Sequence, residues 1–129
     1  MEIPHILLAD DDADTRELVE LVLRRAGFRV SVIDESSQVL NVLGTDRFDA
    51  LLLDNYMPKI NGMELCQLIR CMNRSIPIVI CSGAVSDSDK KAALAAGAQA
   101  YIAKPFAPHE LSETLNAVLA QAKVQEECL

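Results

Sequence analysis

Positive charge is scarce in this sequence, and no basic stripe runs along it. Twelve lysines and arginines stand against nineteen aspartates and glutamates, which gives a formal net charge of −7 and an isoelectric point of about 4.7. A protein that holds nucleic acid through its phosphates needs clustered basic residues. The composition therefore argues against direct nucleic-acid binding.

The sequence also has no long apolar run and no cysteines at the spacing of a zinc site. No run approaches the roughly 20 residues that span a bilayer, and the N-terminal "MEIPHILLADDD" has no basic segment and meets acid too early for a signal peptide. The four cysteines, at positions 66, 71, 81 and 128, have no histidine or cysteine partners at zinc spacing. We expect free thiols, no membrane association and a cytoplasmic location.

Short apolar runs alternate with longer helical patterns along the chain. Strands are expected at 5–9, 28–33, 49–54, 76–82 and 100–103, and helices at 12–27, 36–44, 61–72, 86–97 and 108–122. Five strand–helix units with short connections predict an α/β fold, a flavodoxin-like doubly wound parallel sheet with strand order 2-1-3-4-5. Residues 1–122 form one domain in this interpretation, and 123–129 form a flexible tail or the start of a linker.

The apolar positions predict which strands and helix faces are buried. The runs at 5–9, 49–53 and 77–81 are apolar throughout and are expected to be central strands, whereas 28–33 alternates and is expected at an edge. The residues at helical spacing are Leu18, Leu21, Val22 and Arg25, then Leu65, Leu68, Ile69 and Met72, then Leu111, Leu115, Val118 and Ala122. We expect the apolar members of these stripes to face the core.

Chemically active side chains follow four of the five predicted strands. In "ILLADDDADT", Asp10 and Asp11 follow the first strand, while Asp54, Ser82 and Lys104 end or follow the third, fourth and fifth. Parallel strands bring these ends to one edge of the sheet. Carboxylates in contact need a counter-charge, and Mg²⁺ prefers such oxygen ligands. An aspartate can also accept a phosphoryl group. The set is therefore sufficient for Mg²⁺-dependent phosphorylation of Asp54.

The motifs "LLADDD", "LLLDNYMPKINGMEL", "PIVICSGA" and "AYIAKPF" occur in this order. Together they resemble the receiver domain of two-component response regulators, over about residues 4 to 122. The resemblance implies the following roles: Asp54 as phospho-acceptor; Asp10, Asp11, Asp54 and the main-chain carbonyl of Tyr56 as Mg²⁺ ligands; Ser82 and Lys104 as partners of the phosphoryl group; Ser82 and Tyr101 as switch residues; and a cis bond before Pro105. Asn55 stands where the family usually has an apolar residue.

The resemblance also implies a function and partners. The chain would be a signalling switch rather than an enzyme, with a histidine kinase or a histidine phosphotransfer protein as phosphodonor and an output protein or domain downstream. Phosphorylation would act on the face made by 86–97, 100–103 and 108–122, which is also the candidate face for a homodimer.

Other interpretations of the aspartates fit less well. In a calcium loop starting at Asp10, Thr15 occupies the glycine position and Leu21 the glutamate position. An aspartyl-phosphate phosphatase motif from Asp10 places Asp14 where threonine is needed. A pseudo-receiver that only binds partners is an alternative, which the complete set of acceptor, hydroxyl and lysine disfavours. Asp12 and Asp14 are better explained as a helix cap and first-turn charges.

Overall fold

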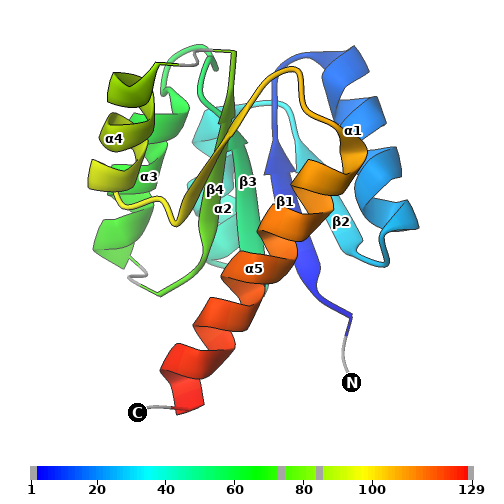
Figure 1. The fold of residues 1–129 in the computed structure, drawn as a ribbon. Helices are drawn as coiled ribbons and strands as arrows, with labels where there is room; N and C mark the ends of the chain where they lie inside the picture. The colour runs from blue at the N-terminus through cyan, green and yellow to red at the C-terminus, as the bar shows by residue number, and fades with distance from the viewer. Residues whose placement is uncertain (1–2, 73–74, 84–85, 128–129) are drawn as a thin grey trace.

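The computed structural model describes residues 3–72, 75–83 and 86–127, with side chains described as far as Val124. In these segments one parallel sheet has the strand order β2-β1-β3-β4-β5, which confirms the predicted flavodoxin-like topology (Figure 1). The strands are β1 (His5–Ala9), β2 (Arg29–Ile33), β3 (Ala50–Asp54), β4 (Ile78–Ser82) and β5 (Ala100–Ala103). The helices are α1 (Ala13–Arg25), α2 (Ser36–Leu43), α3 (Gly62–Met72), α4 (Asp87–Ala95) and α5 (Pro108–Glu127).

The helices cover both faces of the sheet, and each face has its own apolar core. α1 and α5 lie on one face, and α2, α3 and α4 lie on the other (Figure 1). Side chains alternate along each strand between the two cores. Leu51 and Leu53 of β3 face α2, α3 and α4, while Leu52 faces α1 and α5.

The burial of the strands follows their apolar patterns. All five residues of β3 and of β4 are buried, as expected for strands covered on both faces. β2 exposes Arg29 and Val32, in agreement with its predicted place at the edge. The predicted central and edge strands are thus confirmed.

Two of the three predicted helix faces are wrong in part. In α1 the buried residues are Val19 and Leu23, whereas Leu18 and Leu21 are exposed. In α3 the predicted Leu65 and Ile69 are buried together with Cys66, but Leu68 and Met72 are exposed. The predicted stripe of α5 is confirmed for Leu111, Leu115 and Val118, and Ala122 is partly buried.

The last helix continues past the predicted limit of 122. α5 runs to Glu127, so residues 123–127 are helical where a loose tail was one of the two expectations. That these residues begin a linker stays a prediction. Among the described helices, none combines the length and apolar character that crossing a membrane requires. Cys66, Cys71 and Cys81 are free thiols, while Cys128 lies outside the described residues.

Candidate functional site

The carboxyl ends of the strands place the predicted residues at one edge of the sheet. Asp10 directly follows β1, Asp54 is the last residue of β3, and Ser82 is the last residue of β4. Lys104 follows β5, and its main-chain N–H donates to the carbonyl of Ser82 at 2.8 Å. The topology therefore brings together side chains that are up to 94 residues apart in the chain.

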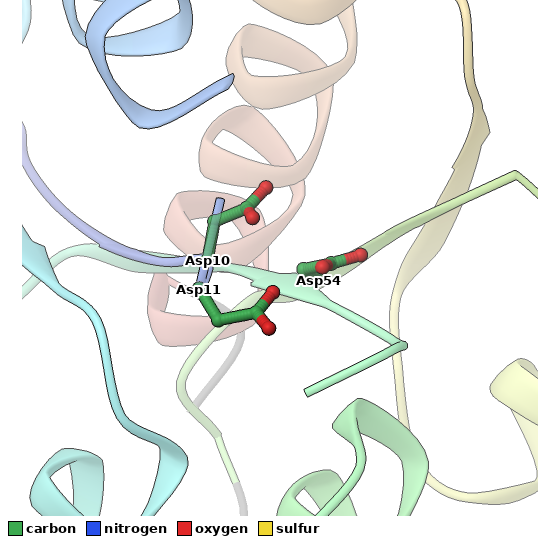
Figure 2. Close-up of side chains that lie close together, drawn as sticks. All are labelled: Asp10, Asp11 and Asp54. Atoms are coloured by element: carbon green, nitrogen blue, oxygen red, sulfur yellow. The ribbon is translucent and has the colours of Figure 1, made fainter. Parts of the chain in front are cut away.

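Three carboxylates gather at the ends of β1 and β3 (Figure 2). Each of Asp10, Asp11 and Asp54 offers an oxygen, and these three oxygens lie within 4.8 Å of one another. Asp10 and Asp54 are buried, being 2% and 7% exposed, whereas Asp11 is exposed. The donor set is made of hard oxygens only, which fits Mg²⁺ and not a softer metal such as zinc.

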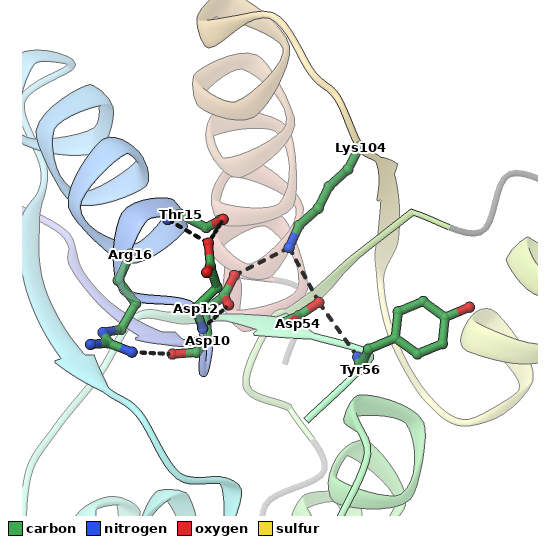
Figure 3. A network of polar contacts seen from close by, with 7 residues as sticks. All are labelled: Asp10, Asp12, Thr15, Arg16, Asp54, Tyr56 and Lys104. Atoms are coloured by element: carbon green, nitrogen blue, oxygen red, sulfur yellow. Dashed lines mark hydrogen bonds and ion pairs between the residues drawn. The ribbon is translucent and has the colours of Figure 1, made fainter. Parts of the chain in front are cut away.

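Lys104 is shared between two of these carboxylates (Figure 3). Its ammonium donates to Oδ2 of Asp10 at 3.2 Å and to Oδ1 of Asp54 at 3.3 Å. The bond between Lys104 and Pro105 is cis, as the resemblance implies. Three carboxylates and one ammonium leave this edge with an excess of negative charge.

The pKa shifts in the site reflect this excess. Burial and the neighbouring Asp10 raise the pKa of Asp54 above its ordinary value, against the opposing effect of Lys104. Burial by itself would lower the pKa of Lys104, but the charges of Asp10 and Asp54 outweigh it and the pKa is raised. Lys104 thus stays an ammonium, and the charged form of Asp54 is disfavoured.

The other aspartates of "ILLADDDADT" have a structural role. Asp12 is the N-cap of α1, and its carboxylate accepts from the main-chain N–H and the hydroxyl of Thr15. These bonds lower the pKa of Asp12. Asp14 lies in the first turn, where the helix dipole favours a negative charge. Both predictions for these residues are confirmed.

Two further side chains fix the main chain of the site: Arg16, for which no role is predicted from the sequence, and Asn55, which stands out in the sequence only as a departure from the family pattern. Arg16 donates to the main-chain carbonyl of Asp10 at 3.0 Å (Figure 3). Asn55, next to the candidate acceptor, bonds to β4 and to the start of α3. An arginine one turn into a helix is common and gives no signal. A polar Asn55 at a usually apolar position is a signal, but it does not by itself indicate which groups the side chain bonds.

Tyr56 is the second residue of the loop after β3, and its main-chain N–H donates to Oδ1 of Asp54 at 3.4 Å. Its ring is 62% exposed and points away from the Asp54 carboxylate (Figure 3). The ring of Tyr56 therefore does not cover the Asp54 carboxylate.

Ser82 and Tyr101 lie on the same face of neighbouring strands. Ile80 pairs with Tyr101 and Ser82 pairs with Ala103 in the β4–β5 register. Because Ile80 packs in the core under α3 and α4, Ser82 two residues later faces the same side. Tyr101 is partly buried and packs against that core. Ala84, which follows Ser82 by two positions, lies outside the described residues.

The sequence and the fold match one family throughout. Residues 6–116 match the response regulator receiver domain. The response regulator MprA of Mycobacterium ulcerans is 35% identical over 122 residues, which are 95% of this chain and 53% of that protein. The chain thus spans about half the length of the curated relatives it matches.

Solved structures give the same result. A putative response regulator from Chloroflexus aurantiacus is 35% identical, covers 92% of this chain and 99% of its own, and superposes with a TM-score of 0.88. A CheY-like receiver domain protein from Methanospirillum hungatei is 25% identical, with coverages of 96% and 99% and a TM-score of 0.89. With its parallel sheet and its acidic edge, this chain belongs to the family of response regulator receiver domains.

Proposed function

We propose that this chain is a phosphorylation switch in which Asp54 accepts a phosphoryl group from the phosphohistidine of a partner protein. The observation that carries the proposal is the ammonium of Lys104, held at 3.2 and 3.3 Å from the two buried carboxylates of Asp10 and Asp54. A buried acceptor beside a fixed cation suits phosphoryl transfer, which depends on position and charge neutralisation.

The transfer exchanges one bond to phosphorus for another. An oxygen of Asp54 forms the new O–P bond while the N–P bond of the phosphohistidine breaks. The electron pair of that bond stays on the imidazole nitrogen, which takes up a proton. Lys104 faces the negative charge on the transferred oxygens, and the hydroxyl of Ser82 supplies a further hydrogen-bond donor.

Asp10, Asp11, Asp54 and the main-chain carbonyl of Tyr56 would hold Mg²⁺, which when bound neutralises negative charge on the carboxylates and on the phosphoryl oxygens. The exposed position of Asp11 leaves this side of the edge open to water and to the partner.

The readout of phosphorylation would be the face made by α4, β5 and α5. Ser82 and Tyr101 lie on the same side of the sheet as α4, so that a change at the phosphoryl group can bias two arrangements of this face. α4 is suited to move, since Ala93 is the one buried residue within it. The partners of this switch would be a histidine kinase or a histidine phosphotransfer protein upstream and an output protein or domain downstream. Two copies of the chain would pair through the same face, formed by α4, β5 and α5.

Phosphorylation by acetyl phosphate tests the proposal. Wild type and Asp54→Asn are incubated with the donor in Mg²⁺ or in EDTA, and the intact mass is measured. We expect one phosphoryl group on the wild type in Mg²⁺, little in EDTA and none on Asp54→Asn. Equal labelling of the variant would place the acceptor elsewhere, and an unlabelled wild type would favour the pseudo-receiver alternative.

A further inference from the structure

The first turn of α3 draws its hydrogen-bond acceptors from two asparagines. A helix begins with N–H groups that find no partner in its own backbone. Asn61 accepts from the N–H of Glu64 at 2.8 Å, and the Glu64 carboxylate accepts from the N–H of Asn61 at 3.4 Å. This capping box leaves the N–H groups of Gly62 and Met63 to be satisfied from outside the helix.

Asn55 provides both missing acceptors. Its main-chain carbonyl accepts from Gly62 at 3.1 Å, and its side-chain Oδ1 accepts from Met63 at 3.2 Å. Its own N–H donates to the carbonyl of Cys81 on β4 at 3.0 Å. Asn55 is therefore held at three points, by a strand on one side and by a helix on the other.

These bonds act on the main chain of the site. Asn55 lies between Asp54, the proposed acceptor, and Tyr56, whose carbonyl is a proposed ligand. The start of α3 is pressed against this segment, because a Cβ on Gly62 would lie 2.8 Å from the carbonyl oxygen of Asp54 and 2.9 Å from Cα of Asn55. The direction of α3 and the direction of the Asp54–Tyr56 backbone are thus set together.

We propose that Asn55 is a positioning residue for the cation and phosphoryl site. By accepting the N–H of Met63, its side chain holds the backbone that aims the Asp54 carboxylate and the Tyr56 carbonyl. The inference rests on the proposed function, which gives these two groups their roles. Groups that orient a ligand without touching the metal typically change metal affinity by about 10-fold to 100-fold when they are removed.

Two alanine variants separate positioning from the stability of the helix. Asn55→Ala and Asn61→Ala each remove one side-chain acceptor from the first turn of α3. We expect both to lower the midpoint of thermal unfolding by about 3 to 5 °C. Only Asn55→Ala should weaken Mg²⁺ binding, by about 10-fold in a calorimetric titration without phosphodonor.

A third variant restores the acceptor. Asn55→Asp keeps an oxygen at the position of Oδ1, and a carboxylate is favoured at the start of a helix. We expect slow hydrogen exchange at the Met63 amide in wild type and Asn55→Asp, fast exchange in Asn55→Ala, and Mg²⁺ affinity in Asn55→Asp at least equal to that of wild type.

The outcomes separate this inference from the proposed function. Mg²⁺ binding by Asn55→Ala as tight as that of wild type would overturn the inference, and so would an equal loss in Asn61→Ala, because the loss would then follow from the fraying of α3. A wild type that binds Mg²⁺ but takes no phosphate from acetyl phosphate would refute the proposed function, while the comparison of affinities would still decide the role of Asn55. A wild type that binds no Mg²⁺ would refute both.

Discussion

Asp54 is buried beside a second carboxylate, and both conditions disfavour its charged form. They raise its pKa above the ordinary value of 3.8, although Lys104 acts in the opposite direction. A raised pKa in the folded state means that ionised Asp54 lowers the free energy of unfolding above that pKa. The stability is regained as the pH falls through the raised pKa toward 3.8.

The destabilisation by ionised Asp54 can be tested in the metal-free protein. In EDTA, Asp54→Asn should unfold at a higher temperature than wild type at about pH 7, because the amide removes a buried charge and fills the same space. The difference should shrink as the pH is lowered to about 4, where the wild type takes up its proton. Thermal unfolding across this range measures it, with Asp46→Asn as a control at an exposed position. A difference that does not vary with pH would contradict the assignment.

At the same scale, the positions of single residues are predictable where topology alone decides them. Asp54, Ser82 and Lys104 each end or follow a parallel strand, so their meeting follows from the strand order. The hydrogen bonds of Asn55 are not predictable, because they depend on the angle at which α3 approaches β3. A pattern along the chain does not contain that angle.

At the scale of secondary-structure elements, Arg70 of α3 forms a hydrogen bond with Gly97, which follows the carboxyl end of α4. The guanidinium of Arg70 donates to the carbonyl of Gly97 at 2.9 Å, to the carbonyl of Ile76 at 2.7 Å and to the side chain of Gln99 at 2.6 Å. Gln99 Oε1 also accepts from the N–H of Ile78 at 2.6 Å. The helix that is expected to move is thus anchored at its carboxyl end, at the sheet edge opposite the acidic site.

Two glycines with positive φ provide a matched test of this anchor. Gly27 follows α1 at φ 97°, and Gly97 follows α4 at φ 111°. A Cβ on Gly27 meets nothing within 4 Å, whereas a Cβ on Gly97 would lie 2.8 Å from Cγ of Arg70. Both Gly→Ala changes incur the backbone cost of about 1 kcal/mol or more, and Gly97→Ala should cost at least about 1 kcal/mol beyond that because it displaces Arg70.

Urea unfolding of the two variants checks this difference. In an Arg70→Met background the extra cost of Gly97→Ala should largely disappear, since the three hydrogen bonds are already lost. Equal destabilisation by Gly27→Ala and Gly97→Ala in the wild-type background would show that backbone strain alone accounts for both.

The helix faces show where element-scale prediction fails. In α1 the apolar positions permit two overlapping stripes, one through Leu18 and Leu21 and one through Val19 and Leu23. Helical spacing alone does not choose between them, because Val22 belongs to both. Which stripe is buried depends on the orientation in which α1 packs against the sheet, and this orientation buries Val19 and Leu23. In α5 the apolar residues form a single stripe, and the prediction was right.

For the whole molecule, charge is the property that a bound cation would change most. The chain carries a net charge of −7, and its acidic edge concentrates three carboxylates around one ammonium. A ligand that binds only the folded state stabilises it by about 2.7 kcal/mol at 100 times its dissociation constant. Mg²⁺ at that concentration should raise the unfolding midpoint by about 10 °C.

Differential scanning calorimetry with NaCl at matched ionic strength separates binding from the screening of net charge. Asp11→Asn is the informative variant, because Asp11 is exposed and outside the hydrogen bonds of Lys104. Its Mg²⁺-induced shift should be clearly smaller than that of wild type. A shift of the same size in NaCl, or in Asp11→Asn, would mean that Mg²⁺ acts by screening.

The fold as a whole was the most predictable level. Five apolar runs separated by helical patterns leave little choice but a covered parallel sheet, and the one alternating run, 28–33, lies at the edge. The limits of elements were less predictable, as α5 shows by continuing to Glu127. The end of a helix that extends beyond the core is not marked by a change in the apolar pattern, so the sequence does not predict it.

The position of Lys104 bears on how quickly the proposed switch can reverse. Its side chain is partly buried, and its ammonium lies between two anions before any phosphoryl group arrives. Under the proposed function, phosphorylation replaces one anionic neighbour of this cation by another, and hydrolysis restores the first. Little solvent has to be rearranged in either direction, so the lifetime of the signal would depend on access of water to the phosphoryl group rather than on moving the lysine.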